Sequence, residues 1–327
     1  LNTGGPLIAI ISKEDAARLG IFPEDRIMIN RMRSKESVIA VADVGFGSIK
    51  PGQIGLFNET FEKLGAKDNS AVYIQIAKVP ESLAFIRAKL DGAKLTKEQI
   101  RAIVDDIMAN KLSAIELTYF VAGCYTKGLD LFESANLTNA IADSGKSLKF
   151  GKVVLDKHCI GGIPGNRTTM ILVPIIAVAG FLMPKTSSRA ITSAAGTADV
   201  MEVFCPVNLT AEKIRDCVKK TNACIAWGGT MKLAGADESM IRVRHPLSID
   251  PTGMMLASIL AKKKAVGSTH VLIDIPYGPN AKYTNKQEAQ KLKRKFEKVG
   301  ELIGLKLLVV LTDGSQPVGN GIGPCLE

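Results

Sequence analysis

A glycine-rich stretch at residues 156–169 has the composition of an anion-binding loop, and it reads Asp-Lys-His-Cys-Ile-Gly-Gly-Ile-Pro-Gly-Asn-Arg-Thr-Thr. A short β run precedes it, and an apolar helix is predicted over 168–179. Glycines let backbone N–H groups approach an anion, and a helix N-terminus favours negative charge. Lys157, Arg167 and Thr168 add donors. The stretch lacks the Gly-Lys-Ser/Thr of an NTPase P-loop and the GxGxxG of a dinucleotide fold. It therefore predicts another kind of phosphate site or, alternatively, an ordinary strand–turn–helix loop.

A second stretch, residues 187–199, is dense in hydroxyl groups around one arginine and a turn of small residues. It reads Ser-Ser-Arg-Ala-Ile-Thr-Ser-Ala-Ala-Gly-Thr-Ala-Asp. Such residues can bind phosphate or sugar hydroxyls with little steric hindrance. The alternative interpretation is a loop whose Ser and Thr side chains cap its own backbone.

A third stretch, residues 250–263, starts with Asp250 and Pro251 and continues as a predicted helix. Ser258 and Lys262 lie one turn apart on the same face of this helix. Asp250 also fits the N-cap position of the helix, which is its purely structural interpretation. Two further turns, 277–282 and 313–319, follow along the chain.

These stretches, in this order, resemble the thymidine phosphorylase family from about Leu83 to the end of the chain. The first loop of that family reads Lys-His-Ser-Thr-Gly-Gly-Val-Gly-Asp, and its second carries Ser-Gly-Arg with Thr-Gly-Gly-Thr-x-Asp. In this chain Cys159 replaces a Ser, Gly165 replaces an Asp, and Arg167 is an added cation. These departures, together with the β-rich N-terminal segment, are similar to the archaeal AMP phosphorylase branch. A more positive pocket suits a nucleotide, which brings a second phosphate.

The resemblance implies a pentosyltransferase that converts AMP and phosphate into adenine and ribose 1,5-bisphosphate, with CMP and UMP as further candidate substrates. Phosphate would attack the ribose C1′ through a cationic transition state while the base leaves. Positioning and electrostatics supply most of such catalysis. The implied partners are a nucleotide and inorganic phosphate as co-substrate, and no metal or organic cofactor is expected.

The resemblance also implies roles for particular residues. Asp250 corresponds to the proton donor to the base, a role that burial and nearby phosphate charge would favour. Arg242 and Arg244 are both candidates for a substrate-binding arginine. Residues expected around the nucleotide are Gly162, Ser188, Arg189, Ala190, Ile191, Thr192, Ser193, Thr197, Ser258 and Lys282. Residues expected near the attacking phosphate are Lys157, Cys159, Thr168 and Ser187, and further candidates are His158, Arg167 and Lys262.

The elements that must position these residues indicate an α/β multidomain protein. Short strands with Gly and Pro turns predict a β-barrel-like N-terminal domain over 1–80. Apolar residues that recur three and four positions apart predict a helical domain over 82–150, which returns at about 236–264. A change to strand–helix alternation predicts an α/β domain of the nucleoside phosphorylase type over 151–327. This last domain is expected to be incomplete, since the chain stops before the alternation is completed.

Local signals predict the individual elements. Thr96 and Ser113 are expected helix N-caps, because Gln99 and Glu116 stand three residues later. The predicted strands are 6–11, 26–32, 38–44, 54–57, 71–76, 271–275 and 306–311. The predicted helices are 13–19, 96–109, 113–127, 132–144 and 168–179.

Composition limits the class of protein. The 327 residues carry a net charge of +10, which fits anionic partners. Aromatic residues make up 5% of the chain, and no RNA-binding motif is visible, so no nucleic-acid partner is expected. The six cysteines form no CxxC pair, which argues against a zinc site and for free thiols. No signal peptide or membrane span is visible, and a cytoplasmic location is expected.

Three other functions remain open at this point. A pyrimidine nucleoside (thymidine) phosphorylase would prefer a nucleoside to AMP. Anthranilate phosphoribosyltransferase, a more distant relative, would need magnesium and a diphosphate donor. A basic nucleic-acid-binding or scaffold protein would bind nucleic acid with steep salt dependence. The resemblance further implies a homodimer or a larger homo-oligomer for the full-length protein.

Overall fold

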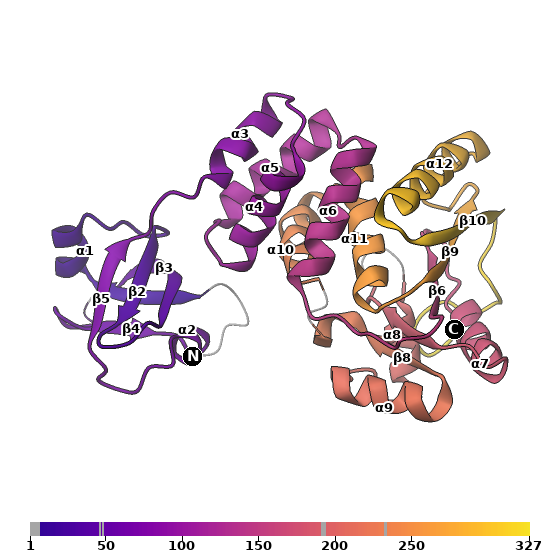
Figure 1. Cartoon of the computed structure of the whole chain (residues 1–327), viewed down its shortest axis with the longest axis horizontal. Coiled ribbons are helices and arrows are strands. Elements are labelled where there is room, and N and C mark those ends of the chain that lie inside the picture. Colours follow the sequence, from indigo (N-terminus) through magenta and orange to yellow (C-terminus); the bar gives the residue numbers. More distant parts are fainter. Residues whose placement is uncertain (1–6, 46, 48, 191–193, 232–233) are drawn as a thin grey trace.

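The computed structural model describes residues 7–45, 47, 49–190, 194–231 and 234–327. The predicted site residues Ile191, Thr192 and Ser193 lie outside this set. Figure 1 shows a β-rich N-terminal part at one side, a group of helices in the middle, and an α/β part that holds the C-terminus. The helical part and the mixed α/β part that the sequence predicted are both present.

The N-terminal part is a five-stranded sheet in the order β4-β1-β3-β2-β5. Its elements are β1 (Ile8–Ser12), α1 (Lys13–Leu19), β2 (Arg26–Arg31), β3 (Ser37–Gly45), β4 (Ile54–Leu56), α2 (Asn58–Leu64) and β5 (Val72–Ile76). Alternating buried positions on β2 and β3 face a small aliphatic core. Helix α2 was not among the helices that the sequence predicted. Strands β4 and β5 are the edges of the sheet among the described residues, and barrel-like closure stays a prediction.

Two side chains join the N-terminal part to the helices. The Arg26 guanidinium donates to the Leu112 carbonyl at 2.6 Å, and the Asn110 amide donates to the Ile39 carbonyl at 3.1 Å. Both contacts involve the turn at residues 110–112, between two helices of the helical part. The sheet therefore attaches to the outer end of the helical part, away from the α/β part (Figure 1).

The helical part packs six helices around one hydrophobic core. They are α3 (Ser82–Leu90), α4 (Lys97–Met108), α5 (Ala114–Lys127), α6 (Leu131–Ser144), α10 (Gly235–Arg244) and α11 (Thr252–Ala265). The capping boxes predicted at Thr96 and Ser113 are confirmed, since each N-cap side chain and its partner three residues later exchange hydrogen bonds. Large buried side chains of this core include Ile100, Ile103, Phe120, Leu137 and Ile141.

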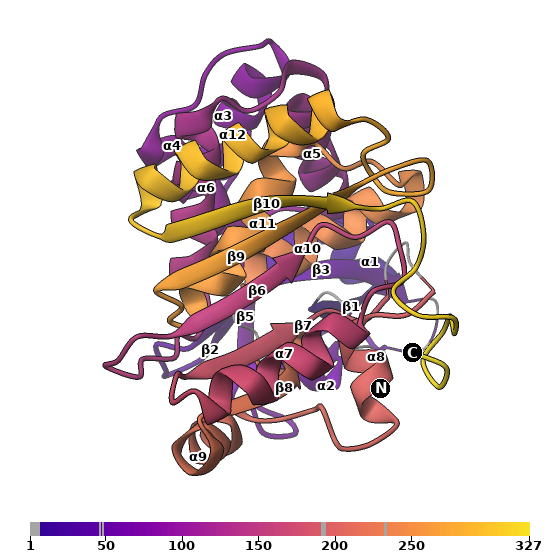
Figure 2. The ribbon, with the colours of Figure 1, turned by 90° about the vertical axis from the view of Figure 1, so that its right-hand side faces the viewer.

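The α/β part is built on parallel strands. It contains β6 (Leu155–Cys159), α7 (Arg167–Val178), β7 (Met183–Ser187), α8 (Thr197–Glu202), α9 (Ala211–Thr221), β8 (Ala223–Trp227), β9 (His270–Tyr277), α12 (Lys286–Ile303) and β10 (Lys306–Asp313). Strand β9 pairs with both β10 and β6, and β7 pairs with β8. A parallel bridge between Val154 and Leu182 brings β6 next to β7. Figure 2 shows the strands in the order β10, β9, β6, β7, β8, with α12 and α7 in front.

The carboxyl ends of these strands carry the stretches singled out in the sequence. Strand β6 ends before the glycine-rich turn, and β7 ends at Ser187, the first serine of the Ser-Ser-Arg turn. Strands β9 and β10 end before the turns at 278–282 and 314–319. Strand β6 begins at Leu155, so Asp156, Lys157 and His158 continue the strand rather than the loop. Ligands bind outside the carboxyl ends of parallel strands in open α/β sheets.

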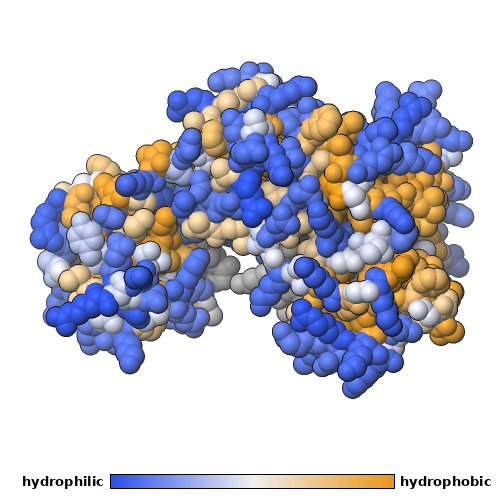
Figure 3. Space-filling view, viewed as in Figure 1, coloured by the Kyte–Doolittle hydropathy of each residue, from blue (hydrophilic) through white to orange (hydrophobic). Residues whose placement is uncertain are grey.

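Helix α7 presents an apolar face to solvent. Ile171, Ile175 and Val178, at helical spacing, are 61%, 58% and 90% exposed. Figure 3 shows hydrophobic residues on all three parts, with the largest continuous area over the α/β part. Exposed apolar patches mark contact surfaces. Among the described residues, no helix is both long and apolar enough to cross a membrane.

A buried ion pair inside the helical part gives a test of this packing. Lys89 of α3 lies 2.7 Å from the Glu133 carboxylate of α6, and both side chains are 3% exposed. Lys89→Met leaves that carboxylate buried without its cation, so the free energy of unfolding should fall by about 3–5 kcal/mol. The exposed pair of Lys94 and Asp130, at 3.1 Å, provides the control. Urea titration measures both variants, and Lys94→Met should lower the free energy of unfolding by less than about 1 kcal/mol. Equal losses in the two variants would contradict a buried Lys89–Glu133 ion pair.

Candidate active site

The glycine-rich turn packs directly against the turn that follows β9. Gly162 has φ +99°, and a Cβ atom placed there would lie 2.2 Å from the Lys282 backbone nitrogen. Gly161 has φ +87°, but a Cβ there would meet nothing within 4 Å. Two predicted site residues, Gly162 and Lys282, are therefore neighbours, and the closeness of their backbones requires glycine at 162.

The two halves of the second stretch are also in direct contact. A Cβ atom on Gly196 would lie 2.5 Å from the Ser188 carbonyl oxygen. The Asp199 carboxylate accepts hydrogen bonds from the Ala190 N–H at 2.7 Å and the Gly196 N–H at 2.9 Å. Burial raises the pKa of Asp199, but these hydrogen bonds and Arg189 outweigh it and lower the pKa overall. Asp199 thus closes the loop that contains Ser188 and Ala190.

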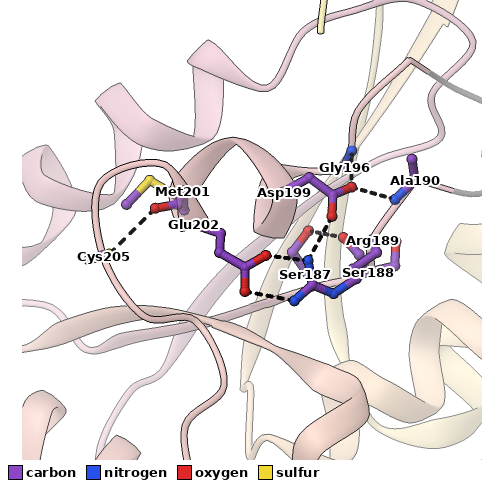
Figure 4. A network of polar contacts seen from close by, with 9 residues as sticks. All are labelled: Ser187, Ser188, Arg189, Ala190, Gly196, Asp199, Met201, Glu202 and Cys205. Carbon is purple, nitrogen blue, oxygen red and sulfur yellow. Dashed lines mark hydrogen bonds and ion pairs between the residues drawn. The ribbon is translucent and has the colours of Figure 1, made fainter. Parts of the chain in front are cut away.

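Arg189 is engaged within its own loop. Its guanidinium lies 3.0 Å from Asp199 and donates to both oxygens of Glu202 at 2.6 and 2.8 Å (Figure 4). The same group lies 4.9 Å from the centroid of the Trp227 ring, a cation–π distance. In this arrangement Arg189 fixes the start of the loop to α8, and its contact with the substrate stays a prediction.

Asn166 connects the first stretch to the second, although it was not among the residues selected from the sequence. Its side-chain oxygen accepts from the Thr197 hydroxyl at 2.9 Å, and its amide donates to the Ala195 carbonyl at 3.1 Å. The Asn166 backbone and side-chain N–H groups both donate to the Glu327 carboxylate at 3.0 Å. An asparagine just before a helix is the signal that could have found this link, because its amide both donates and accepts.

Arg167 and Thr168 open helix α7 next to this link. The Arg167 guanidinium donates to the carbonyls of Val318 at 2.6 Å and Gly321 at 3.2 Å, and also to that of Leu326. Its donors therefore hold the segment after β10. Thr168 lies half-buried in the first turn of α7, beside the glycine-rich turn.

Asp250 lies between two cations. One carboxylate oxygen accepts from Arg244 at 3.3 Å and the other accepts from Lys282, which also approaches the Met255 sulfur at 3.4 Å. Arg244 is buried, whereas Arg242 on the same helix is exposed, so Arg244 is the arginine beside Asp250. Asp250 precedes α11 of the helical part and Lys282 belongs to the α/β part. This ion pair therefore bridges the two parts.

Ser258 and Lys262 share a buried carboxylate of helix α10. One oxygen of Asp237 accepts from the Ser258 hydroxyl at 2.7 Å and from the Lys262 ammonium at 2.6 Å. Lys262 also donates to the Ser258 hydroxyl at 3.2 Å. Asp237 is 2% exposed and was not predicted from the sequence. The contact holds the two predicted substrate-binding side chains on one face of α11.

Two consecutive residues of strand β6, Asp156 and Lys157, are charged and buried. Lys157 lies 3.7 Å from Asp274 of β9, and the Asp274 carboxylate also accepts from Thr312 at 2.6 Å. Asp156 lies 2.8 Å from Lys263 of α11. Burial, with the nearby Asp274 charge, raises the pKa of the Cys159 thiol to about 11, so the thiol is neutral near pH 7.

His158 is the centre of a cationic environment. Burial lowers its pKa well below the ordinary value, and the charges of Lys263, Lys185, Lys262 and Lys157 lower it further. The imidazole is therefore neutral near pH 7. Ser187, at the end of β7, donates to the Ser188 carbonyl at 3.0 Å.

The structure thus brings most predicted residues to one edge of the sheet. Gly162, Lys282, Asp250 and Arg244 form one group, and Ser258 and Lys262 lie further along α11, where both contact Asp237. Arg189 is held by Asp199 and Glu202, and Arg167 by backbone carbonyls after β10, while their contacts with the substrate stay predictions. Among the described residues, no group of three or more His, Cys, Asp or Glu side chains is placed to hold a metal. The arrangement offers cations for oxyanions and a carboxylate for proton transfer.

Comparison with protein families matches two parts of the chain. Residues 83–145 match the helical bundle domain of the glycosyl transferase family, and residues 151–270 match the a/b domain of that family. The two matches together cover more than half of the chain. The first covers α3 to α6 of the helical part, and the second covers the α/β part up to the start of β9 together with α10 and α11. The family resemblance predicted from the motifs is confirmed.

The similar proteins fall under two different names. The AMP phosphorylase of Natronomonas pharaonis is 44% identical over 328 residues, covering 100% of this chain and 64% of that protein. The AMP phosphorylase of Methanococcus maripaludis (strain C6) is 43% identical and covers 99% of this chain and 64% of that protein. A Legionella pneumophila (strain Paris) protein named as a thymidine phosphorylase is 46% identical, covering 90% of this chain and 57% of that protein. The chain thus spans 57–64% of the length of these relatives.

A solved structure shares the fold. Anthranilate phosphoribosyltransferase from Thermus thermophilus matches with a TM-score of 0.57 at 17% sequence identity. The match covers 72% of this chain and 68% of that one. At this identity the likeness concerns the fold alone.

The close approach of Gly162 to Lys282 predicts unequal effects of two alanine substitutions. Gly161→Ala should cost about 1–2 kcal/mol of unfolding free energy, because alanine disfavours a left-handed backbone. Gly162→Ala carries the same penalty and in addition a collision with the backbone at residues 281–282, so it should cost clearly more. Chemical denaturation of both variants measures the difference. Equal losses would show that the two turns do not pack as described.

Proposed function

This chain belongs to the thymidine phosphorylase family of glycosyl transferases, and we propose that it catalyses the phosphorolysis of AMP. The observation that carries the proposal is the similarity to proteins named AMP phosphorylase over 99–100% of the chain. The match to the protein named thymidine phosphorylase covers 90% of the chain, so it also includes much of the N-terminal β-rich part. The cationic site is consistent with a substrate that carries its own phosphate.

In the proposed reaction an oxygen of inorganic phosphate forms a bond to the ribose C1′ as the bond from C1′ to the base nitrogen breaks. The bonding pair leaves with the base, which takes up a proton. The products are adenine and ribose 1,5-bisphosphate. The protein must hold two anions close together, and it must supply the proton. Positioning and preorganised charge are sufficient for most of such a rate enhancement, so the proposal requires no metal or organic cofactor.

The first requirement, anion binding, is supported by the edge of the sheet. The glycine-rich turn leads into the N-terminus of α7, and Lys157 lies buried in the strand before it. Thr168 and Ser187 add hydroxyls at the ends of neighbouring elements. We assign these groups to the attacking phosphate, because hydrogen bonds from charged and backbone donors favour oxyanions.

The second requirement, a proton donor, is assigned to Asp250. Its carboxylate is held by Lys282 and Arg244. A phosphate group of the nucleotide offers Lys282 a competing anionic partner. Transfer of Lys282 to that phosphate frees one carboxylate oxygen, and the added negative charge favours protonation of Asp250. Ser258 and Lys262, held by Asp237, lie on the same helix and are assigned to the base.

Substrate preference gives the direct test of the proposed function. The protein incubated with phosphate should release adenine from AMP, and the rate with adenosine or thymidine should be lower. Adenine and a bisphosphorylated ribose are measured by chromatography and phosphorus NMR. Faster release of base from thymidine than from AMP would favour a nucleoside phosphorylase instead. No release of base from any of them, in phosphate buffer, would reject both functions.

Asp250→Asn tests the proton donor. The amide preserves the shape of the side chain but cannot supply the proton, so kcat should fall roughly 10²- to 10⁴-fold. The matched control is Asp105→Asn, because Asp105 is an exposed carboxylate of α4 that pairs with Arg101. The control should leave kcat unchanged. Near-normal turnover of Asp250→Asn, with an unchanged circular dichroism spectrum, would exclude Asp250 as the donor.

A further inference from the structure

Four lysines surround His158 where β6, β7 and α11 meet. Lys157 belongs to β6, Lys185 to β7, and Lys262 and Lys263 to α11, and all four charges act on the His158 ring. Lys157, Lys185 and Lys263 are between 2% and 4% exposed. Buried lysines are rare and are normally paired with a carboxylate.

Three of these lysines have such a partner. Lys157 pairs with Asp274, Lys262 with Asp237, and Lys263 with Asp156. Four ammonium groups and three carboxylates leave one ammonium in excess.

The lysine in excess is Lys185. Its Nζ donates to the Thr186 carbonyl at 2.6 Å, and among the described residues no carboxylate oxygen lies within ion-pair distance. A backbone carbonyl satisfies one of its three donors and does not neutralise its charge.

The surroundings of Lys185 explain what this excess charge costs. It faces Asp156, Lys157 and His158 on β6 and Lys263 on α11, and it pairs with Ile225 across β8. Burial lowers the pKa of Lys185 to about 7, with Lys263 and Lys157 adding to the effect and Asp156 opposing it. The ammonium therefore lacks a counter-charge that the protein itself supplies.

We infer that Lys185 is a further ligand of the substrate oxyanion, so that a phosphate group provides the negative charge that the lysine cluster around His158 lacks. The inference rests on the proposed function, which brings two phosphate groups to this edge of the sheet. Lys185 stands two residues before Ser187, and His158 beside it is half-buried rather than fully enclosed. An oxyanion near that ring would meet donors from three elements. Its binding would favour the ammonium form of Lys185 and take up a proton.

Binding of sulfate to the protein tests the site without catalysis. Sulfate has the shape of phosphate and does not titrate between pH 6 and 9. Any proton taken up on binding is therefore bound by the protein and not by the anion. Calorimetry at pH 8 in two buffers of different ionisation enthalpy should show uptake of close to one proton. Lys185→Met should weaken sulfate binding about 10- to 100-fold, the span of one charge-assisted hydrogen bond, and abolish the uptake. The control Lys152→Met removes an exposed lysine just before β6 and should change neither.

Stability provides a second readout that shows whether the variant is folded. Because the pKa of Lys185 is lowered from 10.5 to about 7 in the folded protein, the unfolded chain binds the proton more tightly between these values. The folded protein is therefore destabilised by Lys185 below pH 7, and this effect is relieved as pH rises from 7 toward 10.5. Lys185→Met should thus have a higher Tm than the parent at pH 6.5 without anion, and a flatter dependence of Tm on pH above 7.

Steady-state kinetics separate the two sources of phosphate. A rise in KM for inorganic phosphate alone identifies the attacking group as the ligand, and a rise in KM for AMP alone identifies the nucleotide phosphate. Unchanged sulfate affinity and proton uptake in a folded Lys185→Met variant would overturn the inference. Sulfate binding that depends on Lys185, in a protein inactive on AMP, would keep the anion site and reject the proposed function.

Discussion

The parallel pairing of β6, β9 and β10, and of β7 with β8, is the constraint on which the site depends. Parallel strands need crossover connections, so their carboxyl ends come to one edge while the chain between them is long. Segments as distant as 160–166 and 278–282 are therefore forced into contact. The backbones approach closely at Gly162 and at Gly196, where a Cβ atom would collide with the backbone at 281–282 and at 188–190. Glycine at 162 follows from the convergence of two strand ends, and glycine at 196 from the contact between the two ends of the β7–α8 connection, in addition to any contact with an anion.

Convergence of so many basic residues on one edge creates an electrostatic problem that the fold solves with carboxylates from other elements. Asp274 of β9, Asp156 of β6, Asp237 of α10 and Asp250 before α11 each contact a lysine near this edge. Buried ion pairs add little net stability, but they fix the direction of long side chains. Lys157 and Lys262 are thereby held in place before any ligand binds. Such preorganisation lowers the cost of ordering the site during the reaction.

The sequence was sufficient for features that depend on neighbouring residues. The capping boxes at Thr96 and Ser113, the strands of the N-terminal sheet and the order of the motif-bearing turns all have local signals. It was insufficient for contacts set by packing between distant segments. Nothing near Arg189 indicates that Glu202 and Trp227 engage it, and Lys185 stands in a short strand with no spacing that marks it. Asp237 likewise gains its role only because α10 packs against α11.

In the proposed reaction, the ion pair between Asp250 and Lys282 connects catalysis with substrate choice. It bridges the helical part and the α/β part, and each partner has an assigned role in the proposed reaction. Exchange of the Lys282 contact from a carboxylate to a phosphate replaces one anion with another, so its electrostatic cost is small. A nucleoside offers no such replacement, and Lys282 would then stay on Asp250 and oppose protonation of the carboxylate. On this argument the phosphate of the nucleotide does more than add binding energy, because its charge prepares the proton donor in the same step.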